Sequence, residues 1–329
     1  MSENKEKKPK LCASGIGGQA VLEGVMMRNK DHYSVAVRKT NKEIAIDIQE
    51  HTPITSKVKI FGLPFIRGVF NFVDSMVVGI KTLSYSASFF EDEEGVDDEP
   101  SKFEKWLTEK FGEKLEGVIM GVTVAISILF SVVLFMLLPL AVADLMERFI
   151  PFVQDEHIPA IEGVVKMMIF VLYVYLISFM PDIKRTYMYH GAEHKCINCI
   201  ETGKVLNVEN VRKSSRFHKR CGTSFLLIVM IISIIFFMCI RSDNVFMRYA
   251  VRVVLVPVIA GISYEFIRLA GSTDNKFVGL LSKPGMWLQK ITTSEPTDDM
   301  IEVAIAAVEA VFDWKKYLKD NGISVPEEE

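Results

Sequence analysis

The chain has 329 residues, half of them apolar, and a formal net charge of −3. A charge this close to balance argues against a nucleic-acid-binding protein, so nucleic acid is not an expected partner. Five cysteines are few for a chain of this length, and because their number is odd they do not indicate a disulfide framework. We therefore expect thiols or metal ligands in a reducing compartment. The lysine-rich first ten residues have no apolar core behind them, and we expect no secretory signal there.

Residues 1–56 form the first predicted unit, a cytosolic Gly-rich segment followed by a β-hairpin. Residues 34–38 and 43–48 alternate polar and apolar side chains around a Thr-Asn pair, which is typical of a hairpin. Residues 57–90 follow as an amphipathic helix. Its polar residues are three, four or seven apart and share one stripe: Arg67, Asn71, Asp74 and Lys81. Such a helix either packs on a bundle or lies in the membrane interface.

Residues 91–116 form the next unit, a linker with a juxtamembrane helix. Seven of the nine residues in 91–99 are acidic, which predicts a solvated linker. The helix after it carries one apolar face that leads into the first long apolar run; this face contains Phe103, Trp106, Leu107 and Phe111.

Residues 117–270 form the predicted transmembrane domain. About 20 apolar residues of helix cross a bilayer core, and four runs are candidates: 118–142, 163–180, 221–240 and 249–270. The fourth run is the weakest, because only 253–264 is free of charge. Residues 181–220 hold nine Lys and Arg, whereas 143–162 hold one. The positive-inside rule places this basic loop in the cytoplasm, and four spans then place both termini there too.

Residues 271–329 are predicted to be a cytosolic tail with an amphipathic helix. Thr297 is positioned to cap a helix over about 298–318, with acids in the first turn and lysines near the end, as the helix dipole favours. Its apolar stripe is expected to be core: Ile301, Ala304, Val308, Val311 and Phe312. The predicted fold class is thus mainly α and integral to the membrane, with about four transmembrane helices, a small N-terminal β-hairpin region and this C-terminal helix.

The residues that carry chemistry begin at Tyr-His-Gly-Ala-Glu-His-Lys, 189–195. His190 and His194 are four apart, so on a helix they share a face and can chelate one zinc ion. Glu193 beside them could act as general base on water at the metal, as in the H-x-x-E-H pattern of inverted zinc metallopeptidases. The alternative is a pair of hydrogen-bonded histidines at the membrane surface.

Further candidate ligands follow. The C-x-x-C pattern ending at Cys199 and the H-x-x-C pattern from His218 to Cys221 offer more ligands than one tetrahedral zinc needs. We favour a single site that contains His190 and His194 with His218 or Cys221. Glu265 is another candidate, because an ionisable residue near membrane depth is often functional; its alternative role is an ion pair with Arg268.

Four segments of the chain resemble the YqhQ family of bacterial multi-pass membrane proteins, which are uncharacterised and predicted to be metal-dependent enzymes: 17–28, 190–195, 220–225 and 287–296. The resemblance implies a bacterial cytoplasmic membrane. Cys196 is not a usual feature of the family, which favours His190 and His194 with His218 or Cys221. The family carries a proline where this chain has Lys219.

The Gly-rich segment 17–28 is not a phosphate-binding loop, because it lacks G-x-G-x-x-G and a terminal Lys-Ser/Thr. Glu23 and Arg28 are polar groups in its apolar sequence. They mark either the edge of a substrate site or a structural pair buried against the bundle. The sequence leaves open whether this segment meets His190.

Two functions remain. One is a zinc-dependent hydrolase at the cytoplasmic membrane surface, acting on a peptide or a lipid-linked substrate. The other is a non-enzymatic membrane factor or adaptor in membrane-protein insertion, assembly or quality control, with a structural metal or thiol site. A transporter is disfavoured, because the spans hold few charges and no internal repeat is visible. The bilayer is the expected partner; membrane-protein partners and a homo-oligomer stay open.

Overall fold

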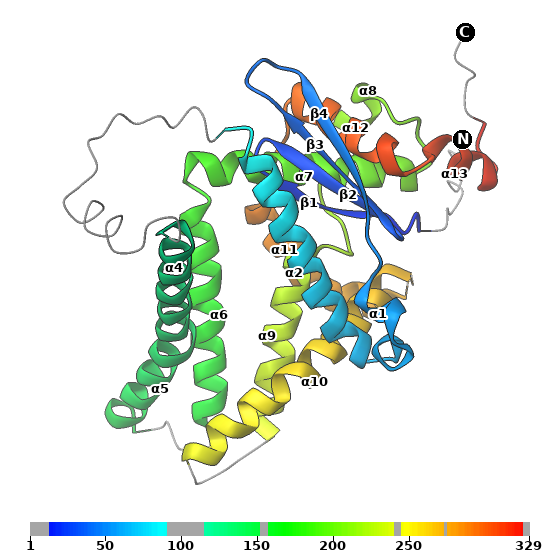
Figure 1. Ribbon diagram of the computed structural model, residues 1–329. Helices are drawn as coiled ribbons and strands as arrows, with labels where there is room; N and C mark the ends of the chain where they lie inside the picture. The colour runs from blue at the N-terminus through cyan, green and yellow to red at the C-terminus, as the bar shows by residue number, and fades with distance from the viewer. Residues whose placement is uncertain (1–12, 91–114, 152–156, 240–244, 273–274, 325–329) are drawn as a thin grey trace, which may run out of the picture. The chain divides into compact units, whose positions relative to one another are not determined.

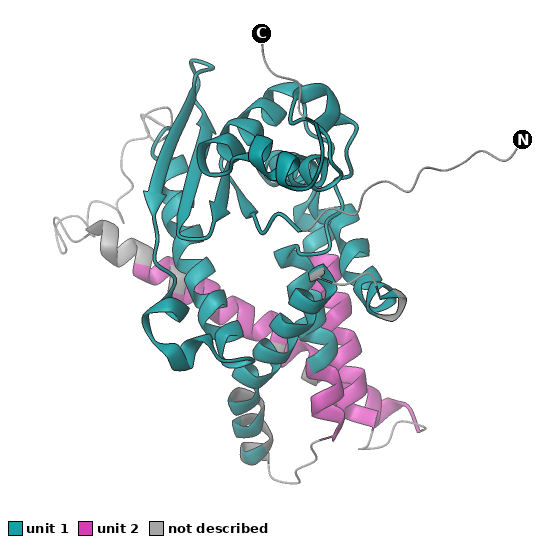
Figure 2. Cartoon of the chain, turned by 90° about the vertical axis from the view of Figure 1, so that its right-hand side faces the viewer, with its two compact units in different colours: residues 1–90, 174–232, 242–329 teal, residues 91–173, 233–241 magenta. Residues whose placement is uncertain are grey.

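In the computed structural model, the described residues are 13–90, 115–151, 157–239, 245–272 and 275–324. The chain divides into two compact units (Figure 2). One unit contains residues 1–90, 174–232 and 242–329, and the other contains 91–173 and 233–241. The predicted acidic linker and its helix face at 103–111 lie outside the described residues.

A four-stranded antiparallel sheet, ordered β1-β2-β3-β4, lies in the first unit (Figure 1). Its strands are β1 Gly17–Val21, β2 Gly24–Asn29, β3 His32–Arg38 and β4 Ile44–Glu50. The predicted hairpin is confirmed as β3–β4, in which Arg38 pairs with Ile44. Strands β1 and β2 form a second hairpin that the sequence analysis does not predict. They join through a tight turn in which Glu23 has a φ of 48°.

Helices cover both faces of the sheet, and the period of two along each strand decides which side chain meets which helix. On one face, Val25, Met27 and Ala36 join a core formed with α7 (Pro181–Glu201) and α12 (Asp298–Val311). On the other face, Val35 and Val37 pack with α2 (Ile66–Ala87). Segments from the start, middle and end of the chain therefore share one core (Figure 1).

The C-terminal helix is divided, which corrects the single helix expected over 298–318. Helix α12 ends at Val311, and α13 spans Trp314–Asp320. Phe312 has extended backbone angles, and the Asp313 side chain accepts a hydrogen bond from the Lys316 backbone N–H, which starts the new helix. Thr297 is at the N-cap of α12 but makes no side-chain cap bond. The expected packing stripe is confirmed, because it lies in the core shared with the sheet.

Among the described residues, three helices are long and apolar enough to cross a membrane, by length and composition: α6 Ile158–Ile177, α9 Gly222–Cys239 and, within α10 Val245–Ser272, the stretch Val254–Gly271. The run that the sequence ranks weakest is thus a continuous helix. The first predicted run folds as α4 Leu115–Val132, a π-helical turn and α5 Leu138–Phe149. Its described apolar part, Gly121–Phe135, is shorter than the other three.

Helix α2 has the expected polar stripe; its first three residues face the protein, and Lys81 is exposed. Arg67 donates two hydrogen bonds of 2.6 Å to Glu265 of α10, and the Asn71 amide donates to the Tyr264 hydroxyl at 2.8 Å. Asp74 is buried and accepts a bond from Arg28. The apolar side chains point away from these contacts and are at least 40% exposed: Phe72, Val73, Met76, Val77, Ile80 and Leu83.

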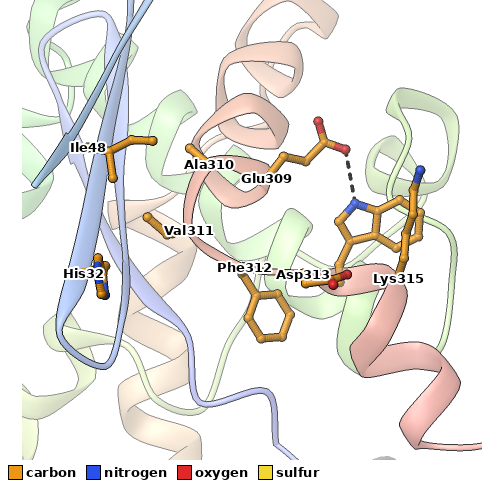
Figure 3. A pocket seen from close by; sticks show the side chains of 9 residues that line it. His32, Ile48, Glu309, Ala310, Val311, Phe312, Asp313 and Lys315 are labelled. Atoms are coloured by element: carbon orange, nitrogen blue, oxygen red, sulfur yellow. Dashed lines mark hydrogen bonds between the residues drawn. The ribbon is translucent and has the colours of Figure 1, made fainter.

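The remaining helices are short or connect these layers: α1 Ile54–Lys57, α8 Val208–Arg212 and α11 Lys276–Thr292. A cavity of about 650 Å³ lies where α12 passes into α13, beside β3 and β4 (Figure 3). The Trp314 indole donates a hydrogen bond of 3.1 Å to Glu309 at its edge. The histidines and cysteines singled out in the sequence do not line this cavity, so it is separate from the site described next.

Candidate metal centre

Helix α7 places His190 and His194 on one face, as their spacing predicts. The two ring centroids are 4.4 Å apart. Cys221, at the start of α9, completes the group: its Sγ atom is 3.3 Å from Nε2 of His190. One ligand atom from each residue lies within 4.8 Å of the other two. All three side chains belong to the first unit.

Backbone carbonyls fix the orientation of both imidazoles. Nδ1 of His190 is 2.9 Å from the Thr292 carbonyl oxygen, and Nδ1 of His194 is 2.7 Å from that of Arg216. A carbonyl oxygen only accepts, so each Nδ1 carries a proton and donates. Each neutral ring then has its lone pair on Nε2. Metal-binding histidines are usually held by such a hydrogen bond from the other nitrogen.

Gly191 allows the Thr292 segment to come this close. A Cβ atom at position 191 would lie 2.1 Å from the Ser294 carbonyl oxygen, a separation that no side chain tolerates. The Ser294 backbone N–H also donates to the Tyr187 carbonyl oxygen at 2.9 Å. The segment is thereby pinned against α7 on both sides of His190.

Without a metal ion, the environment favours a charged pair, with a protonated His190 imidazole beside a Cys221 thiolate. Burial alone lowers the pKa of His190, but the adjacent Cys221 raises it to about 9. Burial likewise raises the pKa of the Cys221 thiol, but the charge and hydrogen bond of His190 outweigh burial and hold it well below its usual value. A thiolate in this position is the form that binds a metal.

Glu193 lies beside the group, under strand β1. Its side chain is 5% exposed, and a Cβ atom on Gly18 would lie 3.0 Å from its Cγ. Glu193, both α7 histidines and Cys221 line one small cavity of about 100 Å³. No hydrogen bond to the Glu193 carboxylate occurs among the described residues, so its oxygens can meet a ligand in this cavity.

His218 lines the same cavity but is outside the three-donor group. Its Nε2 is 3.6 Å from Glu201, which also pairs with Arg220 and accepts from the Ser14 hydroxyl at 2.7 Å. The Gln289 amide donates to the His218 carbonyl oxygen at 2.7 Å. Of the two alternatives left open by the sequence, Cys221 is the one that lies in the three-residue group found among the described residues.

The C-x-x-C pattern is part of the core. Cys196 and Cys199 are both buried among apolar side chains of α7 and α12. The Cys199 thiol donates to the Val205 carbonyl oxygen at 3.5 Å, and burial raises its pKa to about 11. Neither cysteine belongs to the three-donor group.

The other candidate residues form ion pairs away from the histidines. Glu23 accepts two 2.5 Å hydrogen bonds from Arg185, at the start of α7. Arg28 pairs with Asp74, and Glu265 pairs with Arg67, with Arg268 more distant at 3.9 Å. The Gly-rich segment does meet the site, but through Gly18 and not through these charged residues.

The fold and the site define a class of protein: a mainly helical chain whose described part has three helices of membrane-spanning length and a His-His-Cys group beneath a small antiparallel sheet. The chain belongs to the DUF1385 family, proteins of unknown function, whose profile matches residues 63–314. It is 38% identical over 296 residues to the uncharacterized protein YqhQ of Bacillus subtilis (strain 168), covering 88% of this chain and 89% of that protein. No solved structure matches the chain.

Proposed function

We propose that the chain is a membrane metalloprotein in which His190, His194 and Cys221 hold one zinc ion and Glu193 serves as general base in hydrolysis. One observation carries the proposal: carbonyl oxygens engage both Nδ1 atoms, which leaves both Nε2 atoms for a metal, and Nε2 of His190 is 3.3 Å from the Cys221 sulfur. Two imidazole lone pairs and a thiolate aimed at one point are a ligand set suited to zinc.

The donor separations fit this ion. Ligands at about 2.0–2.3 Å from a tetrahedral zinc lie about 3.5 Å from one another. The donor atoms here are within 4.8 Å of one another, so small side-chain adjustments close the site. Zinc would replace the proton shared by His190 and Cys221. Three protein ligands leave one position open, as in catalytic zinc sites.

Glu193 supplies the proton transfer in this proposal. Zinc contributes Lewis acidity, lowering the pKa of water toward about 7 and polarising a carbonyl or phosphoryl oxygen. The Glu193 carboxylate lines the cavity beside the three donors. It takes the proton from the attacking water and returns it to the leaving group. Gly18 keeps the space above this carboxylate free of a side chain.

The membrane setting is also part of the proposal. The outward apolar face of α2 suits a helix lying in the membrane interface. The basic residues of 181–220 favour the cytoplasmic side for the site. A substrate at that surface is a peptide or a lipid-linked molecule.

A second candidate function is supported by the small size of the cavity. At about 100 Å³, it leaves little room beyond a metal and one water. Glu193 could then be a fourth ligand that closes a structural site. The protein would in that case be a non-enzymatic membrane factor or adaptor, and the metal would link α7 to the start of α9.

Metal content, measured by mass spectrometry on the full chain purified in detergent without chelator, tests the proposal. We expect about one zinc per chain in the wild type and a loss of zinc in His190→Ala/His194→Ala and in Cys221→Ser. His218→Ala is the matched control, because His218 lines the same cavity outside the donor group, and it should retain zinc.

Glu193→Gln separates the two functions. In the catalytic case this variant retains zinc and loses any hydrolase activity found in the wild type. In the structural case it weakens zinc binding. A wild-type protein purified free of metal would refute the zinc site itself.

A further inference from the structure

A second cleft lies across strand β1 from the candidate metal centre. It has a volume of about 410 Å³ and lies between the first two strands and α2. Its lining comes from residues 15–19, β2 and the middle of α2, with Arg220 at one end. Arg220 and residues 16–18 also line the cavity that contains Glu193. The two spaces are thus neighbours separated by the first residues of β1.

The charged residues that line this cleft are all cations: Arg28, Lys30 and Arg220. Two of them are held in place from behind. Asp74, which also contacts His51 at 2.7 Å, pairs with Arg28, and Glu201 pairs with Arg220. Lys30 has no ion-pair partner among the described residues. Because carboxylates pair with both arginines, the surplus positive charge of the lining is that of Lys30, and the two guanidinium groups are held in orientation.

Polar groups suited to an anion complete the lining. The side chains of Gln19 and Ser75 both border the cleft. A Cβ atom on Gly17 would meet nothing within 4 Å, so this part of β1 is open to a ligand. Arginine pairs and neutral donors around one space are the usual arrangement for an oxyanion with several acceptor oxygens.

The surroundings of the cleft indicate what the anion is attached to. Ser75 and Val78 border it from α2. The next residues around that helix, Phe72 and Met76, are 40% and 52% exposed. An anionic group in the cleft would thus lie beside an apolar surface, as the headgroup of a lipid lies beside its acyl chains.

We propose that this cleft binds a phosphate group and that it anchors the ligand of the adjacent metal centre. The phosphate belongs either to a lipid headgroup or to a soluble phosphate compound. The anchoring role rests on the proposed hydrolase function; the binding itself does not need the metal.

Isothermal titration calorimetry on the detergent-solubilised full chain tests the binding. The probes are dihexanoyl phosphatidic acid, inorganic phosphate and, as a carboxylate, acetate. The decisive pair of variants is Lys30→Glu and Lys42→Glu. Both lysines are in hairpin turns with positive φ, 54° and 70°, but only Lys30 borders the cleft.

We expect Lys30→Glu to weaken phosphate binding about tenfold or more, as loss of one charge-assisted hydrogen bond does, and Lys42→Glu to change it less than about twofold. Tighter binding of the lipid than of inorganic phosphate assigns the headgroup as source, and equal binding assigns a soluble compound. No measurable phosphate binding, equal effects of both variants, or acetate binding as tightly as phosphate would each overturn the proposal.

The same titration on His190→Ala/His194→Ala separates this proposal from the metal site. Phosphate binding should persist in that variant. In the wild type, phosphate binding by a protein that contains no zinc would support the cleft and contradict the hydrolase proposal. A wild-type protein that contains zinc but does not bind phosphate would support the metal site and contradict the cleft.

Discussion

At the scale of single residues, the site depends on backbone groups that hold side chains in place. Gly191 is the clearest case, because the Ser294 carbonyl oxygen occupies the space of its missing side chain. Alanine inside a helix is normally about 1 kcal/mol more favourable than glycine. Gly191→Ala should instead destabilise the fold by about 1–3 kcal/mol and displace the Thr292 carbonyl from His190.

Thermal unfolding and zinc content in detergent check this prediction together. Gly279→Ala is the control, because position 279 is also helical and a Cβ atom there meets nothing within 4 Å. It should be neutral or stabilising and keep its zinc. If Gly191→Ala behaves like Gly279→Ala, the close approach of the Ser294 segment does not hold the site.

Glu201 gives the fold a dependence on acid pH. Burial raises the pKa of its carboxyl, but the hydrogen bond with His218 and the charge of Arg220 outweigh burial and lower it to about 2, against 4.5 ordinarily. A depressed folded-state pKa contributes stability above the unfolded value and loses it as the pH falls. This contribution, roughly 3 kcal/mol, is therefore present at pH 7 and disappears between about pH 4.5 and pH 2.

Thermal melts of wild type and Glu201→Gln from pH 7 to pH 3 measure this contribution. The wild type should be more stable at pH 7, and the two curves should converge toward pH 3. Glu209→Gln, which removes a fully exposed carboxylate paired with Lys213, should follow the wild type throughout. A constant gap between wild type and Glu201→Gln would contradict the assignment.

At the scale of elements, α2 is notable because most of its polar stripe faces the protein and its apolar face points outward. We expect that apolar face to contact lipid. Spin labels on Ile80→Cys and Ile48→Cys, with Cys12 and Cys239 replaced by Ser, test this in lipid nanodiscs. Both isoleucines are exposed, by 62% and 53%, but Ile48 belongs to the sheet.

The label at position 80 should be more accessible to oxygen, which concentrates in lipid, than to a water-soluble nickel chelate. The label at position 48 should show the opposite order. If both positions show the same order, α2 does not lie in the interface.

The elements differ in how far the sequence predicts them. The β3–β4 hairpin follows from strict alternation and a polar turn. The β1–β2 hairpin was missed, because its two-residue turn is Leu22-Glu23 and Glu23 adopts the positive φ usually taken by Gly or Asn. The break between α12 and α13 was also missed, because the apolar period continues through Phe312.

The site was predictable only in part for a related reason. The spacing of His190 and His194 is local, and a helix converts it into proximity. The partners that orient them are carbonyls of Thr292 and Arg216, which are 102 and 22 residues away. Every residue carries a carbonyl, so no sequence pattern marks these two. Gly191 and the segment 287–296 can be picked out in the sequence, but nothing in the sequence shows that they pack against each other.

At the scale of the whole molecule, the packing of three chain segments constrains the membrane topology. Strand β1 and helix α7 are in direct contact, as are α7 and α12, so if the long apolar helices cross a membrane, we expect all three elements to lie on one side of it. An even number of crossings must separate each pair. Helices α9 and α10, both long and apolar enough to cross, would supply two between α7 and α12. Between the sheet and α7, α6 needs a partner, and the α4–α5 region is the segment that can provide it.

Cysteine labelling with a membrane-impermeant maleimide tests this four-crossing arrangement, again with Cys12 and Cys239 replaced. Cysteines at Lys42, Lys213 and Lys319 report the three segments. A cysteine at Phe149, which is 77% exposed at the end of α5, reports the connection before α6. Because 181–220 is strongly basic, the three lysine positions should be labelled in inside-out vesicles only, and position 149 in right-side-out vesicles only. Labelling of position 149 together with Lys42 and Lys213 would show that neither the α4–α5 region nor α6 crosses the bilayer, and this would contradict the four-crossing arrangement.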